Sequence, residues 1–147
     1  MKKTMLVCAA VVLGGFAQSA WAGGQQVRAE AAADGRSVVV RTYRCGTPSS
    51  FTVVGTAEGV VAGARKTIPL AVARAGEEGV FTVARQWPAE GKWALVFSVE
   101  GSHAVSTLVE LEPGTAIRIA RQKATFEKPT PADVHAVLAS AAPAGSR

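Results

Sequence analysis

The segment from Gly79 to Val99 constrains the fold of this chain most strongly. Its large apolar residues recur with period 2 on both sides of a short stretch that contains Pro88 and Gly91. Period 2 places side chains on one face of a β-sheet, and proline and glycine mark turns. The aligned residues are Phe81, Val83, Trp93, Leu95, Phe97 and Val99. The pattern predicts a hairpin of two strands that supplies much of the hydrophobic core.

The first 22 residues have the pattern of a secretory signal peptide. Lys2-Lys3 precedes an apolar run over residues 5–16, and Ala20-Trp21-Ala22 supplies the small residues of a cleavage site. The run is shorter than the ~20 residues of a membrane span. We therefore expect residues 1–22 to be removed, leaving a periplasmic or secreted protein with no membrane span.

The remaining chain has the length of one small domain. We expect a β-sandwich domain over residues 23–126 and a helix with a tail over residues 127–147. Loss of Lys2 and Lys3 lowers the formal net charge from +5 by two. An exported, mildly basic chain with no clustered basic run is not expected to bind nucleic acid.

Turn signals at regular intervals divide the domain into about seven short strands, which predicts an all-β antiparallel sandwich. Asp34-Gly35 joins the first two strands as a hairpin. Pro69 marks an edge strand, because proline cannot donate a ladder hydrogen bond. Residues 58–64 are expected to be a loop. The expected strands are 26–33, 37–43, 51–57, 65–73, the pair within 79–99, and 104–112, with 116–121 as an eighth strand or an extended tail.

A short helix is expected to begin after Thr130. Thr130 can cap the helix, Pro131 suits its first position, and Asp133 lies near the positive end of its dipole. Val134, Val137, Leu138 and Ala141 follow at helical spacing. A helix of this length is marginal alone in water. We therefore expect it to dock, either on its own sandwich or on another protein.

The strand pair also carries a family resemblance. Gly79-Val-Phe-Thr-Val, Trp87-Pro88 and Gly91-Lys-Trp-Ala-Leu-Val-Phe resemble exported immunoglobulin-like sandwich domains, including FixH-like and YtkA-like periplasmic domains. The resemblance covers about a sixth of the chain and implies an immunoglobulin-like sandwich. Some members of that group are linked to copper handling, but here both methionines precede the expected cleavage site.

Cys45 is the most reactive residue expected in the mature chain. Because Cys8 lies in the signal segment, Cys45 has no intramolecular partner and is buried, cross-linked to a partner or reactive. Arg41 and Arg44 lie nearby and would favour a thiolate. With His103 and His135, Cys45 also completes the set of soft or borderline metal ligands. These three residues lack metal-ligand spacing, so no cofactor is expected, and a metal site using Cys45 with His103 or His135 is an alternative.

Four further residues are candidates for binding. Trp87 either packs beneath the turn or serves as an aromatic anchor for a partner or carbohydrate. Arg41, Tyr43 and Arg85 are expected on an outer sheet face, where they are either solvated or meet an anionic ligand.

The sequence offers little support for catalysis. It has no Gly-x-Ser-x-Gly elbow and no phosphate-binding glycine motif before a helix. We therefore expect a non-catalytic interaction or accessory module that binds another envelope protein, for example by strand addition at a sheet edge. A metal-binding protein and a small hydrolase or redox enzyme are the alternatives.

Overall fold

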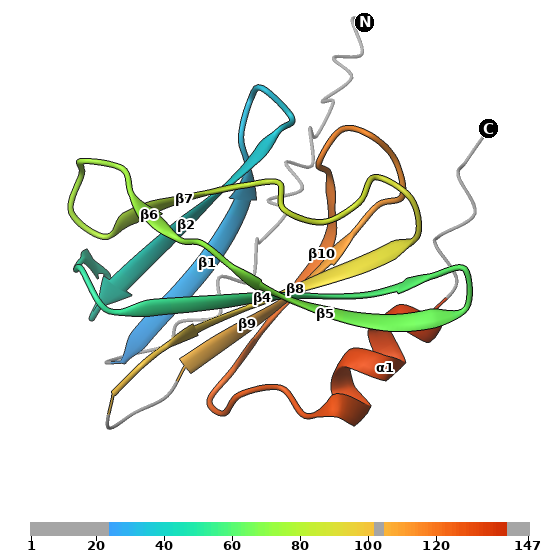
Figure 1. The fold of residues 1–147 in the computed structure, drawn as a ribbon. Helices are drawn as coiled ribbons and strands as arrows, with labels where there is room; N and C mark the ends of the chain where they lie inside the picture. Colours follow the sequence, from blue (N-terminus) through green and yellow to red (C-terminus); the bar gives the residue numbers. More distant parts are fainter. Residues whose placement is uncertain (1–23, 102–104, 141–147) are drawn as a thin grey trace, which may run out of the picture.

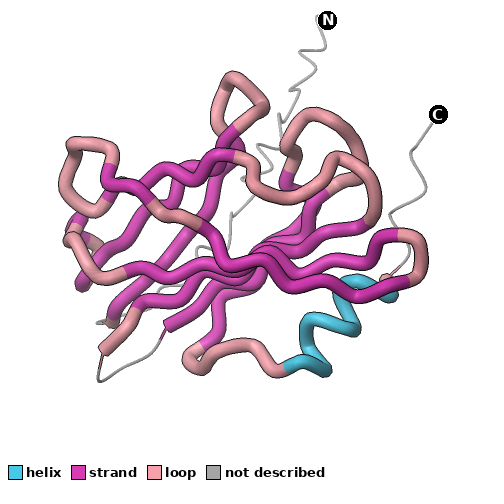
Figure 2. The backbone as a smooth tube through the Cα atoms, in the orientation of Figure 1, coloured by secondary structure: helices cyan, strands magenta, loops and turns pink. Residues whose placement is uncertain are grey.

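The computed structural model describes residues 24–101 and 105–140, which form two antiparallel sheets and one short helix (Figure 1). The first sheet has the order β1-β2-β7-β6, with β3 paired to β2, and the second has the order β10-β9-β8-β4-β5. Figure 2 shows the helix on one side of the strands. The elements are β1 (Gln25–Ala31), β2 (Ser37–Arg44), β3 (Thr47–Pro48), β4 (Val53–Val61), β5 (Ala64–Leu70), β6 (Ala73–Arg74), β7 (Val80–Ala84), β8 (Lys92–Val99), β9 (Val105–Leu111), β10 (Ile119–Thr125) and α1 (Pro131–Ala139).

Inward side chains of both sheets form one hydrophobic core, as expected for a sandwich. Val38 and Val40 of β2 alternate with half-buried outward residues, and Leu95 and Phe97 of β8 are completely buried. The predicted all-β sandwich is therefore confirmed as a fold class. The described residues form ten strands, where about seven and a further one at 116–121 were expected. The two that were missed, β3 and β6, have two residues each and carry no periodic signal.

The predicted hairpin within residues 79–99 is wrong. β7 pairs with β2 and β6, whereas β8 pairs with β4 and β9, so the two strands lie in different sheets. The connection over residues 85–91 crosses from one sheet to the other. Period 2 identified the buried residues correctly. It does not show whether two strands pair within one sheet or lie in two sheets on opposite sides of one core, because the pattern of buried residues is the same in both cases.

Two further expectations need correction. Residues 58–64 are mostly strand, because β4 and β5 pair up to a turn at Ala62-Gly63. Gly59 is required by packing, since a Cβ there would overlap the ring of Trp93. The additional strand predicted at 116–121 exists as β10, but it begins at Ile119 and continues to Thr125. The edge position of Pro69 is confirmed, because β5 ends the order of its sheet.

Helix α1 begins as its sequence predicts. The Thr130 hydroxyl accepts from the Asp133 backbone N–H, and the Asp133 carboxylate accepts from the Thr130 backbone N–H, which completes a capping box. The helix docks on its own domain: Val134 and Leu138 pack on the outward face of the second sheet. The sheet residues in this second cluster are Ala94, Val96 and Leu108.

The cap predicts a pH dependence of helix stability. Hydrogen bonds from the hydroxyl and the backbone N–H of Thr130 lower the pKa of Asp133 below its ordinary value. A carboxylate with a lowered folded-state pKa stabilises the fold above its unfolded pKa, and this contribution is lost as the pH falls through the folded pKa.

We therefore expect amide protection factors in α1 to be higher in the wild type than in Asp133→Asn at neutral pH. The difference should vanish as the pH falls from about 5 to about 2. Hydrogen exchange measured on both proteins at each pH tests this expectation. A difference that persists undiminished at the lowest pH would contradict it.

Candidate functional site

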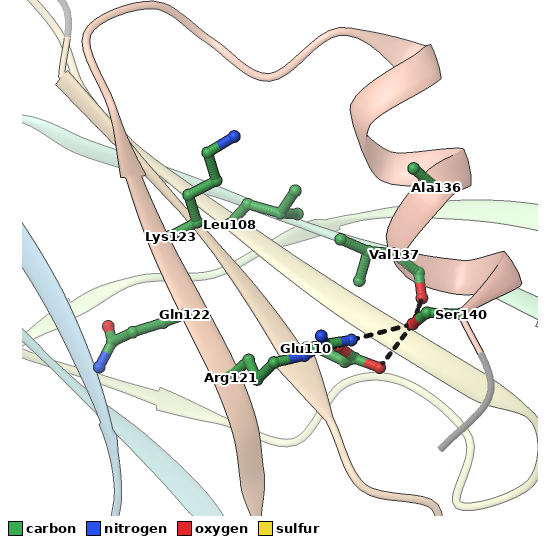
Figure 3. Close-up of a pocket in the computed structure, with 8 residues that line it drawn as sticks. All are labelled: Leu108, Glu110, Arg121, Gln122, Lys123, Ala136, Val137 and Ser140. Atoms are coloured by element: carbon green, nitrogen blue, oxygen red, sulfur yellow. Dashed lines mark hydrogen bonds and ion pairs between the residues drawn. The ribbon is translucent and has the colours of Figure 1, made fainter. Parts of the chain in front are cut away.

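A groove of about 360 Å³ lies between α1 and β10 on the outward face of the second sheet (Figure 3). The register of β9 and β10 places Leu108 opposite Lys123 and Glu110 opposite Arg121. The helix contributes the other wall. The lining residues are Leu108, Glu110, Arg121, Gln122, Lys123, Ala136, Val137 and Ser140.

The groove has an apolar floor and a cationic rim. Leu108 is buried and Val137 is half-buried, and both belong to the apolar cluster beneath α1. Lys123 is exposed and forms no ion pair within the described parts of the chain. Its amino group points away from the other lining side chains in Figure 3. A ligand here would meet apolar surface below and the exposed positive charge of Lys123, which also acts on Asp133 of α1, above.

A buried carboxylate closes one end of the groove. Glu110 is only 3% exposed, and its Oε2 accepts from Arg121 at 2.7 Å from Nη2 and 2.9 Å from Nε. Lys92 Nζ lies 3.7 Å from the other oxygen, Oε1. A buried carboxylate requires such partners, because burying an unpaired charge is costly.

The same charges hold the C-terminus of α1. Lys92 donates to the backbone carbonyl of Ser140, where a positive charge also complements the negative end of the helix dipole. Arg121 Nη2 donates to Ser140 Oγ at 3.2 Å, and this hydroxyl lies 3.1 Å from Glu110 Oε1. We call these four residues the Glu110 clamp. The clamp fixes the end of the helix against β9 and β10 and so sets the width of the groove.

The clamp does not have the geometry of a catalytic site. The Ser140 hydroxyl donates to the backbone carbonyl oxygen of Val137 at 2.7 Å, a local hydrogen bond at the end of the helix. Its carboxylate neighbour, Glu110, already accepts from Arg121 and faces Lys92, so both of its oxygens are engaged in the clamp. Elsewhere in residues 24–101 and 105–140, no three histidine, cysteine, aspartate or glutamate side chains gather to hold a metal ion.

Cys45 lies outside this groove. It is exposed, at the turn between β2 and β3, and its φ of 51° is in the left-handed region. The nearby arginines have other contacts: Arg41 Nε lies 3.4 Å from a Glu30 oxygen, and the Arg44 guanidinium lies over the Phe51 ring at 5.1 Å. In Figure 1 this turn and α1 lie at opposite ends of the molecule, so Cys45 is not brought near His135 of α1. His103 lies outside the described residues.

The other predicted binding residues are separated. Arg41 and Tyr43 alternate with buried Thr42 and share the outward face of β2. Arg85 is not on that face, because it follows the end of β7 and donates to the carbonyls of Gly114 and Thr115. Trp87 is 3% exposed and belongs to the core, with the Arg85 guanidinium over its ring at 5.6 Å. Trp87 therefore packs in the core beneath the turn, and the alternative that it is a surface anchor is wrong.

The groove residues were not predicted from the sequence. One signal was present: Glu110 is the single charged residue of the strand Val105–Leu111, all of whose residues are buried. A charge in such a strand must have a partner. The identity of that partner depends on strand register and helix docking, which the sequence pattern does not specify.

Comparison of the chain with protein-family models, with curated proteins and with solved structures finds no match. The FixH-like and immunoglobulin-like resemblance therefore stays a prediction. Among the described residues, no helix has the length and apolar character needed to cross a membrane.

The clamp predicts a local loss of stability. Glu110→Gln removes the charge that holds Arg121 and Lys92, and we expect the free energy of unfolding to fall by about 2 kcal/mol. Amide protection in α1 should fall further than protection in β8. Urea unfolding and hydrogen exchange measure the two effects.

Glu58→Gln is the matched control. Glu58 faces outward on β4 of the same sheet, where it accepts from Thr67 and lies 3.9 Å from Arg65. Its hydrogen-bond and ion-pair partners are Thr67 and Arg65 of β5 rather than the residues of the clamp, so we expect a loss below about 1 kcal/mol and unchanged protection of α1. Equal effects of the two substitutions on α1 would refute the clamp.

Proposed function

We propose that this chain is a non-catalytic interaction module of the cell envelope, and that the groove between α1 and β10 recognises a segment of another envelope protein. The observation that carries the proposal is the combination of an apolar floor at Leu108 and Val137 with the exposed charge of Lys123. The envelope location rests on the signal-like pattern of residues 1–22. We also propose that the sandwich is of the immunoglobulin-like, FixH-like type.

Charge and shape favour an acidic peptide segment as the occupant. The one carboxylate that lines the groove, Glu110, is already paired with Arg121, and the exposed Lys123, whose charge also acts on Asp133 of α1, forms no ion pair within the described residues and is placed to meet a further negative charge. The volume of about 360 Å³ suits a few side chains rather than a large cofactor. In such sites a buried apolar anchor supplies affinity and charges at the rim supply orientation and association rate.

The two rival functions have less support. A metal site would require Cys45 to meet a histidine, and the turn that carries Cys45 lies at the opposite end of the molecule from α1 and His135. A hydrolase or redox enzyme would require a nucleophile beside a free base. Ser140 has a carboxylate neighbour, but that carboxylate is engaged in the clamp.

Site-specific photo-crosslinking tests the proposed function. A photoreactive amino acid at Ala136, which lines the groove and is exposed, is expected to give one discrete adduct in cells that naturally export the chain. Lys123→Glu should lower its yield about tenfold, since it replaces an attraction by a repulsion. Lys66→Glu, an exposed charge reversal on β5, is the matched control and should leave the yield unchanged.

The same photoreactive residue at Ala33, in the turn between β1 and β2, controls for random capture. The proposal fails if Ala33 gives the same adduct, if Ala136 gives none, or if Lys123→Glu and Lys66→Glu have equal effects. Mass spectrometry identifies the adduct, and titration of the purified partner segment measures its affinity.

A further inference from the structure

Strand β5 is an edge strand whose outer side is open. It ends the order of the second sheet, and among the described strands only β4 pairs with it (Figure 1). Helix α1 packs on β4, β8 and β9, and β4 is the described element against which β5 packs. Residues 64–67 and Pro69 are exposed, and Ile68 is half-buried. The outer side of β5 therefore has room for a further strand.

The turn between β4 and β5 determines which backbone groups face this open edge. Its residues, 62–63, have φ of 49° and 80° and form a two-residue hairpin loop, in which the flanking pair Val61–Ala64 is hydrogen-bonded. Hydrogen-bonded and non-hydrogen-bonded pairs alternate along an antiparallel ladder. The backbone groups of Arg65, Thr67 and Pro69 therefore point away from β4.

Pro69 agrees with this assignment. It has no N–H group, and a position that faces away from β4 costs the ladder no hydrogen bond. The groups that an added strand can use are the N–H and C=O of Arg65 and of Thr67, and the C=O of Pro69. An incoming strand thus meets donors and acceptors in the alternation that an antiparallel partner requires.

The side chains of this edge favour a strand that is acidic and partly apolar. Lys66 is exposed and forms no ion pair within the described residues. Arg65 lies 3.9 Å from Glu58 Oε2, and this same oxygen accepts from the Thr67 hydroxyl, so one shared carboxylate faces the two cations of β5. Ile68 shares a face with Lys66 and packs against the main core, where an added strand would cover its exposed part.

We propose that β5 receives an extended segment of another protein by antiparallel strand addition, and that this segment is acidic opposite Arg65 and Lys66 and apolar opposite Ile68. In this mode of recognition, backbone hydrogen bonds supply affinity and alternate side chains supply specificity. Lys66 and Ile68 would lie in the pairs without hydrogen bonds to the added strand, where facing side chains are closest. These two residues therefore set the register.

A second copy of the chain fits this edge less well than an acidic strand. Two β5 strands side by side would gather Arg65 and Lys66 of both copies along one seam, and cationic edges disfavour such pairing. An acidic strand turns the same charges into attractions. This edge and the groove beside α1 are different surfaces that take different segments, so either proposal can fail while the other holds.

Titration with a peptide tests the proposal. The probe is the acetylated and amidated hexapeptide Thr-Val-Thr-Glu-Glu-Thr, whose valine faces Ile68 and whose glutamates face Lys66 and Arg65 in the proposed register. Amide resonances of β5 in the isotope-labelled full chain should shift with a dissociation constant of about 1 mM or lower. A peptide with lysine in place of both glutamates should bind at least about fivefold more weakly. Equal binding of the two peptides, or no shift in β5 up to about 5 mM, overturns the proposal.

Proline substitution separates backbone pairing from charge attraction. Thr67→Pro removes an N–H that points to the open edge and should weaken binding at least about tenfold. Thr67→Val is the matched control: both variants lose the hydrogen bond to Glu58, but this one keeps the N–H, so its affinity should stay within about twofold of the wild type. Dispersed amide resonances show that each variant is folded.

A modified peptide gives the same test without any change in the protein. N-methylation of its third residue, whose N–H faces the carbonyl of Thr67, should also weaken binding at least about tenfold. Full binding of the methylated peptide overturns the proposal, as does equal binding by the Pro and Val variants. Resonances of β5 that shift with protein concentration alone, and stop doing so in Thr67→Pro, would assign the edge to a second copy instead.

Discussion

The outward face of the second sheet carries an apolar patch, and the docking of α1 depends on covering it. Ala94 and Val96 of β8 and Leu108 of β9 project away from the main core, yet all three are buried under α1. Burial of a valine or leucine side chain is worth roughly 1.5–3 kcal/mol. A helix of nine residues is marginal alone, so the helix and the sheet face stabilise each other.

The groove exists because α1 covers only part of the outward face of the second sheet. The helix packs on β4, β8 and β9, and β10 extends beyond it at the edge of the sheet. Leu108 is therefore covered on one side and borders the groove on the other. The Glu110 clamp holds the helix terminus at this boundary. Lys123 lies outside the clamp as an exposed charge. Covering the apolar patch of the sheet therefore leaves a groove with an apolar floor and a positive rim, the character of a recognition site.

Features set by local chemistry were predictable from the sequence. The capping box of Thr130 and Asp133 acts over four residues, and the edge position of Pro69 follows from its missing N–H group. Period 2 correctly placed Arg41 and Tyr43 on one face of β2.

Features set by contacts distant in sequence were not predictable. The sheet membership of β7 and β8, and the partners of Glu110, depend on which strands meet. The helix spacing indicated a need to dock but not the docking surface. Arg85 was misplaced because the chain leaves β7 at Ala84, where the period-2 rule stops applying.

The most direct test of this account is a methyl-to-methyl nuclear Overhauser experiment on the full chain in solution. The account predicts cross-peaks from the methyl groups of Leu138 to those of Val96 and Leu108, because these side chains share one buried cluster. Absence of these cross-peaks, together with random-coil chemical shifts for residues 131–139, would contradict it. In that case the outward face of the second sheet would be uncovered, and the groove would not exist in solution.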